Sequence, residues 1–221
     1  SALYNCFHPV NKFFPTAPVQ LMSSGDEFDE PGILILHGGG DIHPMFYNRR
    51  NAGSYVGAYP SPRDQSEVKL FAKALKANIF ILGICRGAQL GCAMSGGILA
   101  QDVSGHHQEH HVMTHDGKSF STVSIHHQMM YPWDVEHKLI AWAVRPLSGD
   151  YAGLSEEEIK KWPTRNYGSD KSEIDLIEPE IVWFPTSKCL AVQGHPEMMK
   201  ATDPYNQYLH KLILEHYPIA H

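Results

Sequence analysis

Short apolar runs alternate with helical patterns in the first half of the chain. Residues Ile33–Leu36 are uniformly apolar and lead into three glycines, and a second run, Ile79–Gly83, leads into another glycine-rich turn. Uninterrupted apolar runs of this length are typical of strands that are buried on both faces of a sheet. We therefore expect both runs to be strands of one central sheet.

Two segments that follow these runs have helical periodicity. In residues 61–78, Ser61 is positioned as an N-cap, Pro62 takes the first helical position and Asp64 completes a Ser-x-x-Asp box. A second helix is expected from about Gly87 to Ser95, where two further glycines end it. The order strand, helix, strand, helix favours a parallel sheet.

The remaining pattern completes the expected fold class, which is α/β. We expect a three-layer sandwich in which helices cover both faces of a mostly parallel central sheet. Residues 1–221 are expected to form a single domain, with a polar, partly helical, solvent-facing insertion around residues 151–180. Further strands are expected at TVSIHH, LIAWAV, EIVWF and CLAVQGH, and a last helix at Pro204–His216.

Composition narrows the classes of function. The 221 residues are 43% hydrophobic and 19% charged, with a formal net charge of −6, which does not favour binding to nucleic acid or to an anionic membrane. The sequence has no apolar run of about 20 residues that would span a membrane, and its first ten residues lack the pattern of a signal peptide. We expect a cytoplasmic protein.

One of the four cysteines lies in a motif with chemical meaning. Cys6, Cys92 and Cys189 have no paired spacing and are expected to be packing residues in a reducing compartment. Cys85 lies in Gly-Ile-Cys-Arg-Gly, the cysteine form of a nucleophile elbow, where a strand turns sharply into a helix. The N-terminus of that helix favours the thiolate, which is the reactive form of cysteine.

A base and two hydrogen-bond donors for such a nucleophile are present elsewhere in the sequence. His195 and Glu197 are two residues apart, so on an extended segment their side chains point to the same side. His195 is the candidate base and Glu197 the acid that orients it. The backbone N–H groups of Arg86 and Gly39 are the candidate donors of an oxyanion hole.

These motifs resemble the class I glutamine amidotransferases, a flavodoxin-like fold family, and within them the gamma-glutamyl hydrolase branch. Six segments follow the order of the family's motifs, and one departure is Gly194, where relatives often carry an aromatic residue and where we expect a wider pocket. The six segments are HGGGDIHPMFYN, RDQSE, LGICRGAQL, SGGILAQD, SIHHQ and GHPE.

The resemblance implies a reaction and a set of roles. Cys85 would attack a gamma-glutamyl amide, an amine or ammonia would leave, and water would release glutamate from the thioester. Gln89, Ser124, His126 and His127 would lie near the gamma-glutamyl group. The resemblance implies no cofactor and a small-molecule gamma-glutamyl substrate.

Several other features have simpler interpretations. His106 with His110, or His107 with His111, have the i,i+4 spacing of a zinc site on a helix, but the residues after them favour a strand, and we expect no metal. Arg63, Asp64 and Glu67 are expected to make local helix-start contacts, and Asp41 to cap its own loop. The run Glu156–Glu158 is expected to be a solvated helix start.

Three functions remain open at this stage. The first is a free-standing hydrolase of a gamma-glutamyl amide. The second is a glutaminase that delivers ammonia to a partner synthetase and uses the same residues. The third is a catalytically silent binding module of the same fold.

Overall fold

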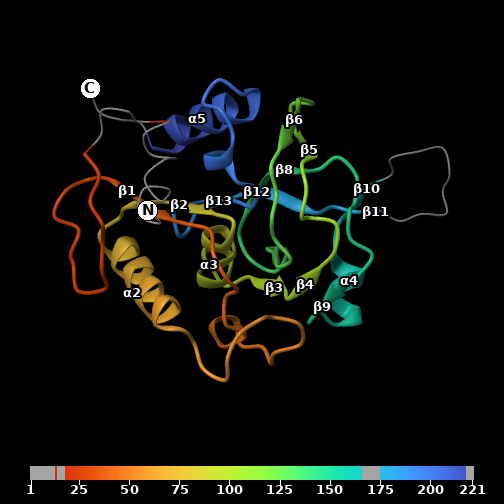
Figure 1. The fold of residues 1–221 in the computed structure, drawn as a ribbon, viewed down its shortest axis with the longest axis horizontal. Helices are drawn as coiled ribbons and strands as arrows, with labels where there is room; N and C mark the ends of the chain where they lie inside the picture. Colours follow the sequence, from red (N-terminus) through yellow and green to blue (C-terminus); the bar gives the residue numbers. More distant parts are fainter. Residues whose placement is uncertain (1–12, 14–17, 166–174, 218–221) are drawn as a thin grey trace.

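A seven-stranded sheet forms the centre of the molecule in the computed structural model, which describes residues 13, 18–165 and 175–217 (Figure 1). The strand order is β1-β2-β13-β12-β8-β5-β6. The strands are β1 (Ile33–Leu36), β2 (Phe80–Ile84), β5 (His110–Thr114), β6 (Ser119–Thr122), β8 (Lys138–Ala143), β12 (Pro179–Phe184) and β13 (Cys189–Val192).

The pairing of the strands changes along this sheet. β1 and β2 are parallel, and so are β2 and β13. From β13 outward the neighbouring strands β12, β8, β5 and β6 are paired in antiparallel fashion. The parallel strands that the sequence predicts are therefore those on which the cysteine elbow is built, and the other half of the sheet consists of antiparallel neighbours.

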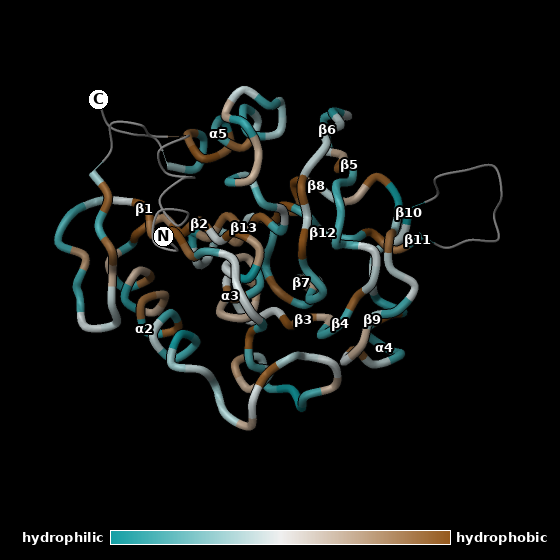
Figure 2. Tube along the Cα trace, in the orientation of Figure 1, coloured by the Kyte–Doolittle hydropathy of each residue, from teal (hydrophilic) through white to brown (hydrophobic). Residues whose placement is uncertain are grey.

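Helices cover both faces of the sheet, which confirms the three-layer α/β arrangement (Figure 1). The helices α2 (Pro62–Lys76) and α3 (Arg86–Met94) pack on one face, and α5 (Pro204–His216) packs on the other. Strand β2 serves both cores, because Ile81 belongs to the cluster under α2 and α3 while Leu82 and Ile84 belong to the cluster under α5. The hydropathy colouring shows these central strands as apolar and the outer loops as mainly polar (Figure 2).

The helix limits agree closely with the sequence pattern. Ser61 accepts a hydrogen bond from the Asp64 N–H at 3.0 Å, and the Asp64 side chain accepts one from the Ser61 N–H at 3.0 Å, so the predicted capping box forms. The last helix spans the predicted Pro204–His216. The segment predicted as the strand TVSIHH differs, because β6 ends at Thr122 and residues 123–127 form no regular element.

The segment around residues 151–180 contains short elements beside the main sheet. Trp162, at the end of α4, is 2% exposed and belongs to a third apolar cluster with Tyr131 and Val103. Glu158 is also buried and pairs with Arg49, so the expectation of a solvated run is correct for Glu156 and Glu157 only. The elements here are β9 (Tyr151–Ala152), α4 (Glu156–Lys161), β10 (Thr164–Arg165) and β11 (Asp175–Leu176).

The remaining short elements lie at the rim of the sheet. They are η1 (Pro44–Tyr47), β3 (Ile98–Ala100), β4 (Asp102–Val103), β7 (Met129–Tyr131) and η2 (Pro196–Met198). β3 pairs with β7 and β4 pairs with β9, both in antiparallel fashion. Among the helices described, none is long and apolar enough to cross a membrane.

Candidate active site

The turn between β2 and α3 holds Cys85 in an unusual backbone conformation. Cys85 has φ 51° and ψ −108°, in a region that residues with a side chain rarely adopt. Such strain is found mainly where function requires it. Its side chain is nearly buried, with 3% of the residue exposed.

The two glycines of the motif allow neighbouring backbone segments to pack closely. A Cβ on Gly83 would lie 2.4 Å from the carbonyl oxygen of Gly87, and a Cβ on Gly87 would lie 2.0 Å from the carbonyl oxygen of Leu36. Neither glycine has a positive φ. The glycines therefore let helix α3 approach β1 and β2, and the strained dihedral angle falls on the cysteine.

His195 and Glu197 lie beside this turn as the sequence predicts. His195 Nδ1 is 2.6 Å from Glu197 Oε1, which sets the proton on Nδ1 and leaves Nε2 available. Burial lowers the pKa of His195, but its contacts with Cys85 and Glu197 outweigh burial and raise that pKa to about 10. His195 Nε2 has no fully formed hydrogen bond among the described residues, and such contacts often tighten only when a substrate binds.

Gly38 lies against both Cys85 and His195. A Cβ on Gly38 would lie 3.0 Å from His195 Cε1 and 3.6 Å from Cys85 Cβ, so the glycine loop after β1 closes the third side of the site. Gly38 was not expected from the sequence, which points to its neighbour Gly39. The close approach of the Cys85 and His195 side chains explains the absence of a side chain at Gly38.

Helix α2 holds the glycine loop through Arg63. The Arg63 guanidinium donates to the carbonyl oxygen of Gly38 at 3.0 Å and to that of His37 at 2.9 Å, and it pairs with Glu67 at 2.8 Å. The local pair with Glu67 is the one expected from the sequence. The contacts with the glycine loop were not expected.

The same helix holds the residue after the nucleophile. The Arg86 side chain is 2% exposed and forms ion pairs with Asp64 and Glu67. The interpretation of Asp64 and Glu67 as purely local helix-start residues is therefore incomplete. An arginine directly after the cysteine, together with the Asp-x-x-Glu spacing on one helix face, was the available sequence signal.

The residues expected on the substrate side fall into two groups. Gln89 is buried and its amide donates to the carbonyl oxygen of Gln128 at 2.8 Å, and Ser124 is fully buried. His127 is partly buried between Asp41 and Asp102, with ring nitrogens 2.7 Å and 3.1 Å from their carboxylates. Asp41 thus contacts a distant segment and also accepts from the Tyr55 N–H, and is more than a cap of its own loop.

His126 points away from its neighbour and into the protein. Its ring is 3% exposed and lies 4.6 Å from the ring of His106, in a group with Glu180 that could hold a metal ion. The zinc pairs considered from i,i+4 spacing are not formed on a helix, because His110 starts strand β5. Contact of Gln89, Ser124, His126 or His127 with a substrate stays a prediction.

The position before the base is filled by other side chains. A Cβ on Gly194 would lie 2.4 Å from Thr122 Oγ1 and 3.3 Å from the Tyr205 hydroxyl. Gly194 therefore makes room for Thr122 and Tyr205, and the structure gives no added width there. Cys92 and Cys189 are buried as expected, and burial raises the pKa of both thiols; Cys6 lies outside the described residues.

A pocket of about 660 Å³, called here the hollow, is lined by residues between His43 and Ala58, which precede the cysteine elbow in sequence. Its lining comes from η1 and residues 48–58 and includes Arg49 and Arg50. None of Cys85, His195 and Glu197 lines this hollow. The hollow is therefore separate from the candidate active site.

Comparison with known proteins gives one match in fold and one in family. The fold is similar to that of a chain in the structure of PurLQS from Thermotoga maritima, which matches with a TM-score of 0.55 at 15% identity, over 98% of this chain and 93% of that one. The Peptidase C26 family profile matches residues 26–197. The chain belongs to the Peptidase C26 family.

Two curated relatives are similar over shorter segments. The glutamine amidotransferase-like protein RP404 of Rickettsia prowazekii is 43% identical over 72 residues, which are 33% of this chain and 25% of that protein. The glutamine amidotransferase-like protein YvdE of Lactococcus lactis is 39% identical over 71 residues, which are 32% of this chain and 30% of that protein. The matched part therefore spans less than a third of each relative.

Proposed function

We propose that this protein hydrolyses a gamma-glutamyl amide through a thioester on Cys85. The observation that carries the proposal is the contact of three elements at one point: the strained Cys85 turn, the His195–Glu197 pair and the Gly38 loop. A nucleophile, a base and a residue that orients the base are the parts that acyl transfer requires. Membership in the Peptidase C26 family supports hydrolysis.

In this mechanism His195 moves one proton in each half of the reaction. The sulfur of Cys85 attacks the gamma-carbonyl carbon, and the imidazolium of His195 gives its proton to the leaving amine as the C–N bond breaks. Water then attacks the thioester, His195 accepts a proton from it, and glutamate leaves as the Cys85 thiol is restored. Glu197 keeps the proton on Nδ1 through its 2.6 Å contact and so directs Nε2 to the reaction.

The oxyanion would be bound by the N–H groups of Gly39 and Arg86. The carbonyl and N–H of a trans peptide point in opposite directions, so Arg63, by binding the Gly38 carbonyl, orients the Gly39 N–H away from helix α2. The Arg86 N–H lies at the N-terminus of α3, where helix N–H groups lack partners within the helix. Loss of one such donor typically costs about 10²–10³-fold in rate.

On the substrate side, the proposal retains Gln89, Ser124, His126 and His127 near the gamma-glutamyl group. His127 has the best-supported case, because its partly exposed ring is held between Asp41 and Asp102, with Tyr55 stacked on it at 4.4 Å. The two carboxylates favour a positively charged leaving group over a negatively charged one. A small-molecule amine fits this environment.

A substrate panel tests the proposal. The purified chain is incubated with glutamine, gamma-glutamyl-GABA, gamma-glutamyl-putrescine and a folate polyglutamate, and released glutamate is measured against Cys85→Ala. We expect at least one substrate to be cleaved well above the variant, and to leave a glutamyl adduct on Cys85 in mass spectra after acid quenching. Equal rates for the wild type and Cys85→Ala on every substrate would refute the hydrolase.

The second candidate is a glutaminase subunit that passes ammonia to a synthetase. The observation in its favour is the shared fold with a chain of PurLQS from Thermotoga maritima. A glutaminase of this kind would cleave glutamine slowly alone and faster when a synthetase is added. A cysteine that forms no adduct with a glutamine-analogue electrophile would instead indicate a silent binding module.

A further inference from the structure

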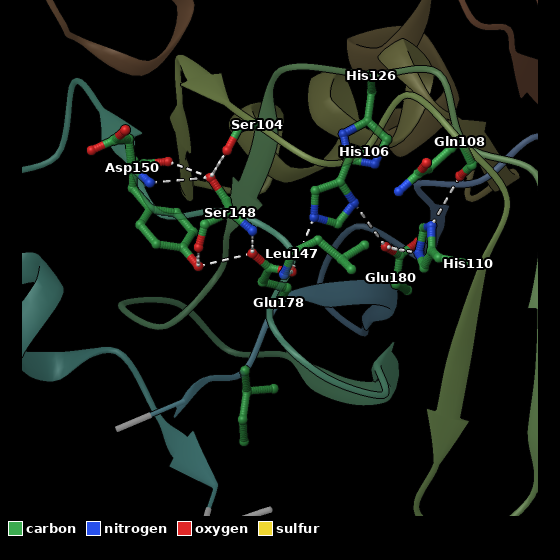
Figure 3. Close-up of polar contacts among 12 residues, drawn as sticks. Ser104, His106, Gln108, His110, His126, Leu147, Ser148, Asp150, Glu178 and Glu180 are labelled. Carbon is green, nitrogen blue, oxygen red and sulfur yellow. Dashed lines mark hydrogen bonds and ion pairs between the residues drawn. The ribbon is translucent and has the colours of Figure 1, made fainter. Parts of the chain in front are cut away.

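A buried cluster of histidines and glutamates lies outside the catalytic triad. It contains His106, His110, His126, Glu178 and Glu180, and all five are at most 8% exposed. His106 precedes β5 and His110 is its first residue, while Glu178 precedes β12 and Glu180 lies within it. His126 comes from residues 123–127, and Figure 3 shows these side chains converging. The proposed hydrolysis uses none of their side chains, except that His126 is also a candidate for substrate contact.

In two histidines of the cluster, one ring nitrogen has no hydrogen-bond partner among the described residues. His106 Nε2 donates to Glu178 Oε2 at 3.0 Å, and His126 Nδ1 donates to the carbonyl oxygen of Gln128 at 2.9 Å. His106 Nδ1 and His126 Nε2 are both buried and make no hydrogen bond within the described part of the chain. The same is true of Glu180 Oε2. Buried polar atoms are rarely left in this state, and each needs an explanation.

These atoms are close enough to share one ion. One ring nitrogen of His106, one of His126 and one carboxylate oxygen of Glu180 all lie within 4.8 Å of one another. His106 Nδ1 is 3.5 Å from Glu180 Oε1, which is long for a hydrogen bond. Two ligands of a tetrahedral zinc ion, each about 2.0–2.1 Å from the metal, are about 3.4 Å apart, so this separation suits two ligands of one ion.

We propose that His106, His126 and Glu180 bind a divalent transition-metal ion, with Zn²⁺ as the best fit. Two imidazole nitrogens and one carboxylate oxygen are a known donor set for zinc, and a water molecule would complete the tetrahedron. His110, which the i,i+4 spacing paired with His106, is not one of the ligands. It donates from Nε2 to Glu180 Oε1 at 2.9 Å and so orients the carboxylate.

The residues around the three ligands are arranged as supports of a metal site. Histidine ligands usually donate their second N–H to a carboxylate or a carbonyl, as His106 does to Glu178 and His126 does to Gln128. Glu178 is in turn held by the N–H groups of Leu147 at 2.7 Å and Ser148 at 2.9 Å (Figure 3).

The ion would have a structural role beside the triad. It would join strand β12, through Glu180, to residues 123–127, through His126. The Val123 carbonyl accepts the backbone N–H of His195 at 2.8 Å, and the Glu180 carbonyl accepts that of Gln193 at 2.8 Å. The metal would therefore fix the two segments against which the base is positioned.

A proton is the competitor of the metal for the same nitrogen. Burial lowers the pKa of His106, but its contacts with the carboxylates of Glu178 and Glu180 outweigh burial and raise that pKa to about 9. A protonated His106 between two carboxylates would be a metal-free ion cluster. Direct measurement of metal content distinguishes the two arrangements.

The first experiment measures the metal in the full chain. The protein is produced in zinc-supplemented medium without an affinity tag that binds metals, and zinc is quantified by inductively coupled plasma mass spectrometry. We expect about one Zn²⁺ per chain in the wild type and less than about a tenth of that in His126→Gln and Glu180→Gln. The matched control is the double variant His107→Gln with His111→Gln, which removes two exposed histidines of the same tract and should retain the metal.

A second measurement covers the case in which the ligand variants do not fold. The wild type is dialysed against a chelator, and its melting temperature is recorded before and after addition of Zn²⁺, or of Co²⁺ with its visible spectrum. We expect the chelator to lower the melting temperature, Zn²⁺ to restore it, and Co²⁺ to give the strong visible bands of a tetrahedral site. A wild type without bound zinc, whose melting temperature does not respond to added Zn²⁺, would overturn the proposal. Neither readout depends on catalysis.

Discussion

At the scale of single residues, Gly87 shows how the sequence motif and its physical basis differ. The pattern G-x-C-x-G predicts a sharp turn at Cys85, and the turn is present. The glycines are required because the backbones of β1, β2 and α3 approach each other, while the positive φ belongs to Cys85. The pattern could not reveal this close approach, because Gly87 of helix α3 packs against Leu36 of strand β1, about 50 positions earlier in the chain.

We predict that Gly87→Ala destabilises the protein while Gly40→Ala does not. The new methyl group at position 87 would lie 2.0 Å from a backbone oxygen that cannot move aside, at a cost of about 1–3 kcal/mol or more. A Cβ at Gly40 meets no atom within 4 Å, so the expected change there is within about 0.5 kcal/mol. Urea unfolding of both variants checks this. Equal stability of Gly87→Ala and the wild type would contradict the packing argument.

The raised pKa of His195 leads to a prediction about pH and stability. The pKa is about 10 in the folded protein, against about 6.5 in the unfolded chain, so the folded state holds the proton more tightly. The resulting stabilisation is complete below about pH 6.5 and is lost as the pH rises through about 10. We expect His195→Gln to be less stable than the wild type by on the order of 1–2 kcal/mol at about pH 6 and by much less at about pH 10.

Urea unfolding of the wild type and His195→Gln at several pH values measures this difference. The control is His107→Gln, whose side chain is exposed and should give a difference that does not vary with pH. A stability difference for His195→Gln that stays constant from about pH 6 to about pH 10 would mean that the folded protein does not hold the His195 proton more tightly than the unfolded chain does.

At the scale of elements, the start of helix α2 has two functions. The sequence predicts its capping box, because that motif depends on residues three positions apart. It does not predict that Arg63 binds the carbonyl oxygens of His37 and Gly38, which are about 25 positions earlier, or that Asp64 and Glu67 bind Arg86. One helix turn thus contacts both residues or peptides that carry the proposed oxyanion donors: the Gly38–Gly39 peptide, through its carbonyl oxygen, and Arg86, through its side chain.

We predict that Arg63→Gln lowers kcat on the cleaved substrate about tenfold or more, with little change in KM, because the Gly39 N–H loses its orientation. Arg63→Lys should recover part of the loss, since an ammonium can bind one of the two carbonyl oxygens. Lys69→Gln, at an exposed position of the same helix, is the control and should leave kcat and KM unchanged. A rise in KM at unchanged kcat would show that Arg63 affects binding and not the oxyanion hole.

Residues 123–127 show the limit of pattern reading for an element. The segment TVSIHH has the β-branched and alternating character of a strand, yet only Thr122 continues β6. The side chains of Ser124 and His126 are buried and polar. His126 donates to the carbonyl oxygen of Gln128 and belongs to the buried cluster of histidines and glutamates. Tertiary contacts of these polar groups outweigh the local preference for a strand.

At the scale of the whole molecule, local signals account for much of the fold and contacts between distant residues account for the rest. The strands β1 and β2, the helices α2, α3 and α5 and the Cys85–His195–Glu197 arrangement follow from short patterns and ordered motifs. The metal-site candidates His106, His126 and Glu180 are up to 74 residues apart, as with His106 and Glu180, and no spacing rule connects them. The antiparallel half of the sheet likewise depends on pairings that single runs do not encode.

The two main cores share strand β2, and this sharing predicts how the molecule unfolds. Ile81 packs under α2 and α3 while Leu82 and Ile84 pack under α5, so loss of either core exposes one face of the same strand. We expect Leu209→Ala, at a fully buried position of α5, to cost about 2–5 kcal/mol and to lower the urea midpoints of far-ultraviolet circular dichroism and tryptophan fluorescence equally. The exposed Leu214→Ala on the same helix is the control and should change little. If Leu209→Ala separated the two transitions, α5 and its core would unfold independently, and β2 would not couple the two faces.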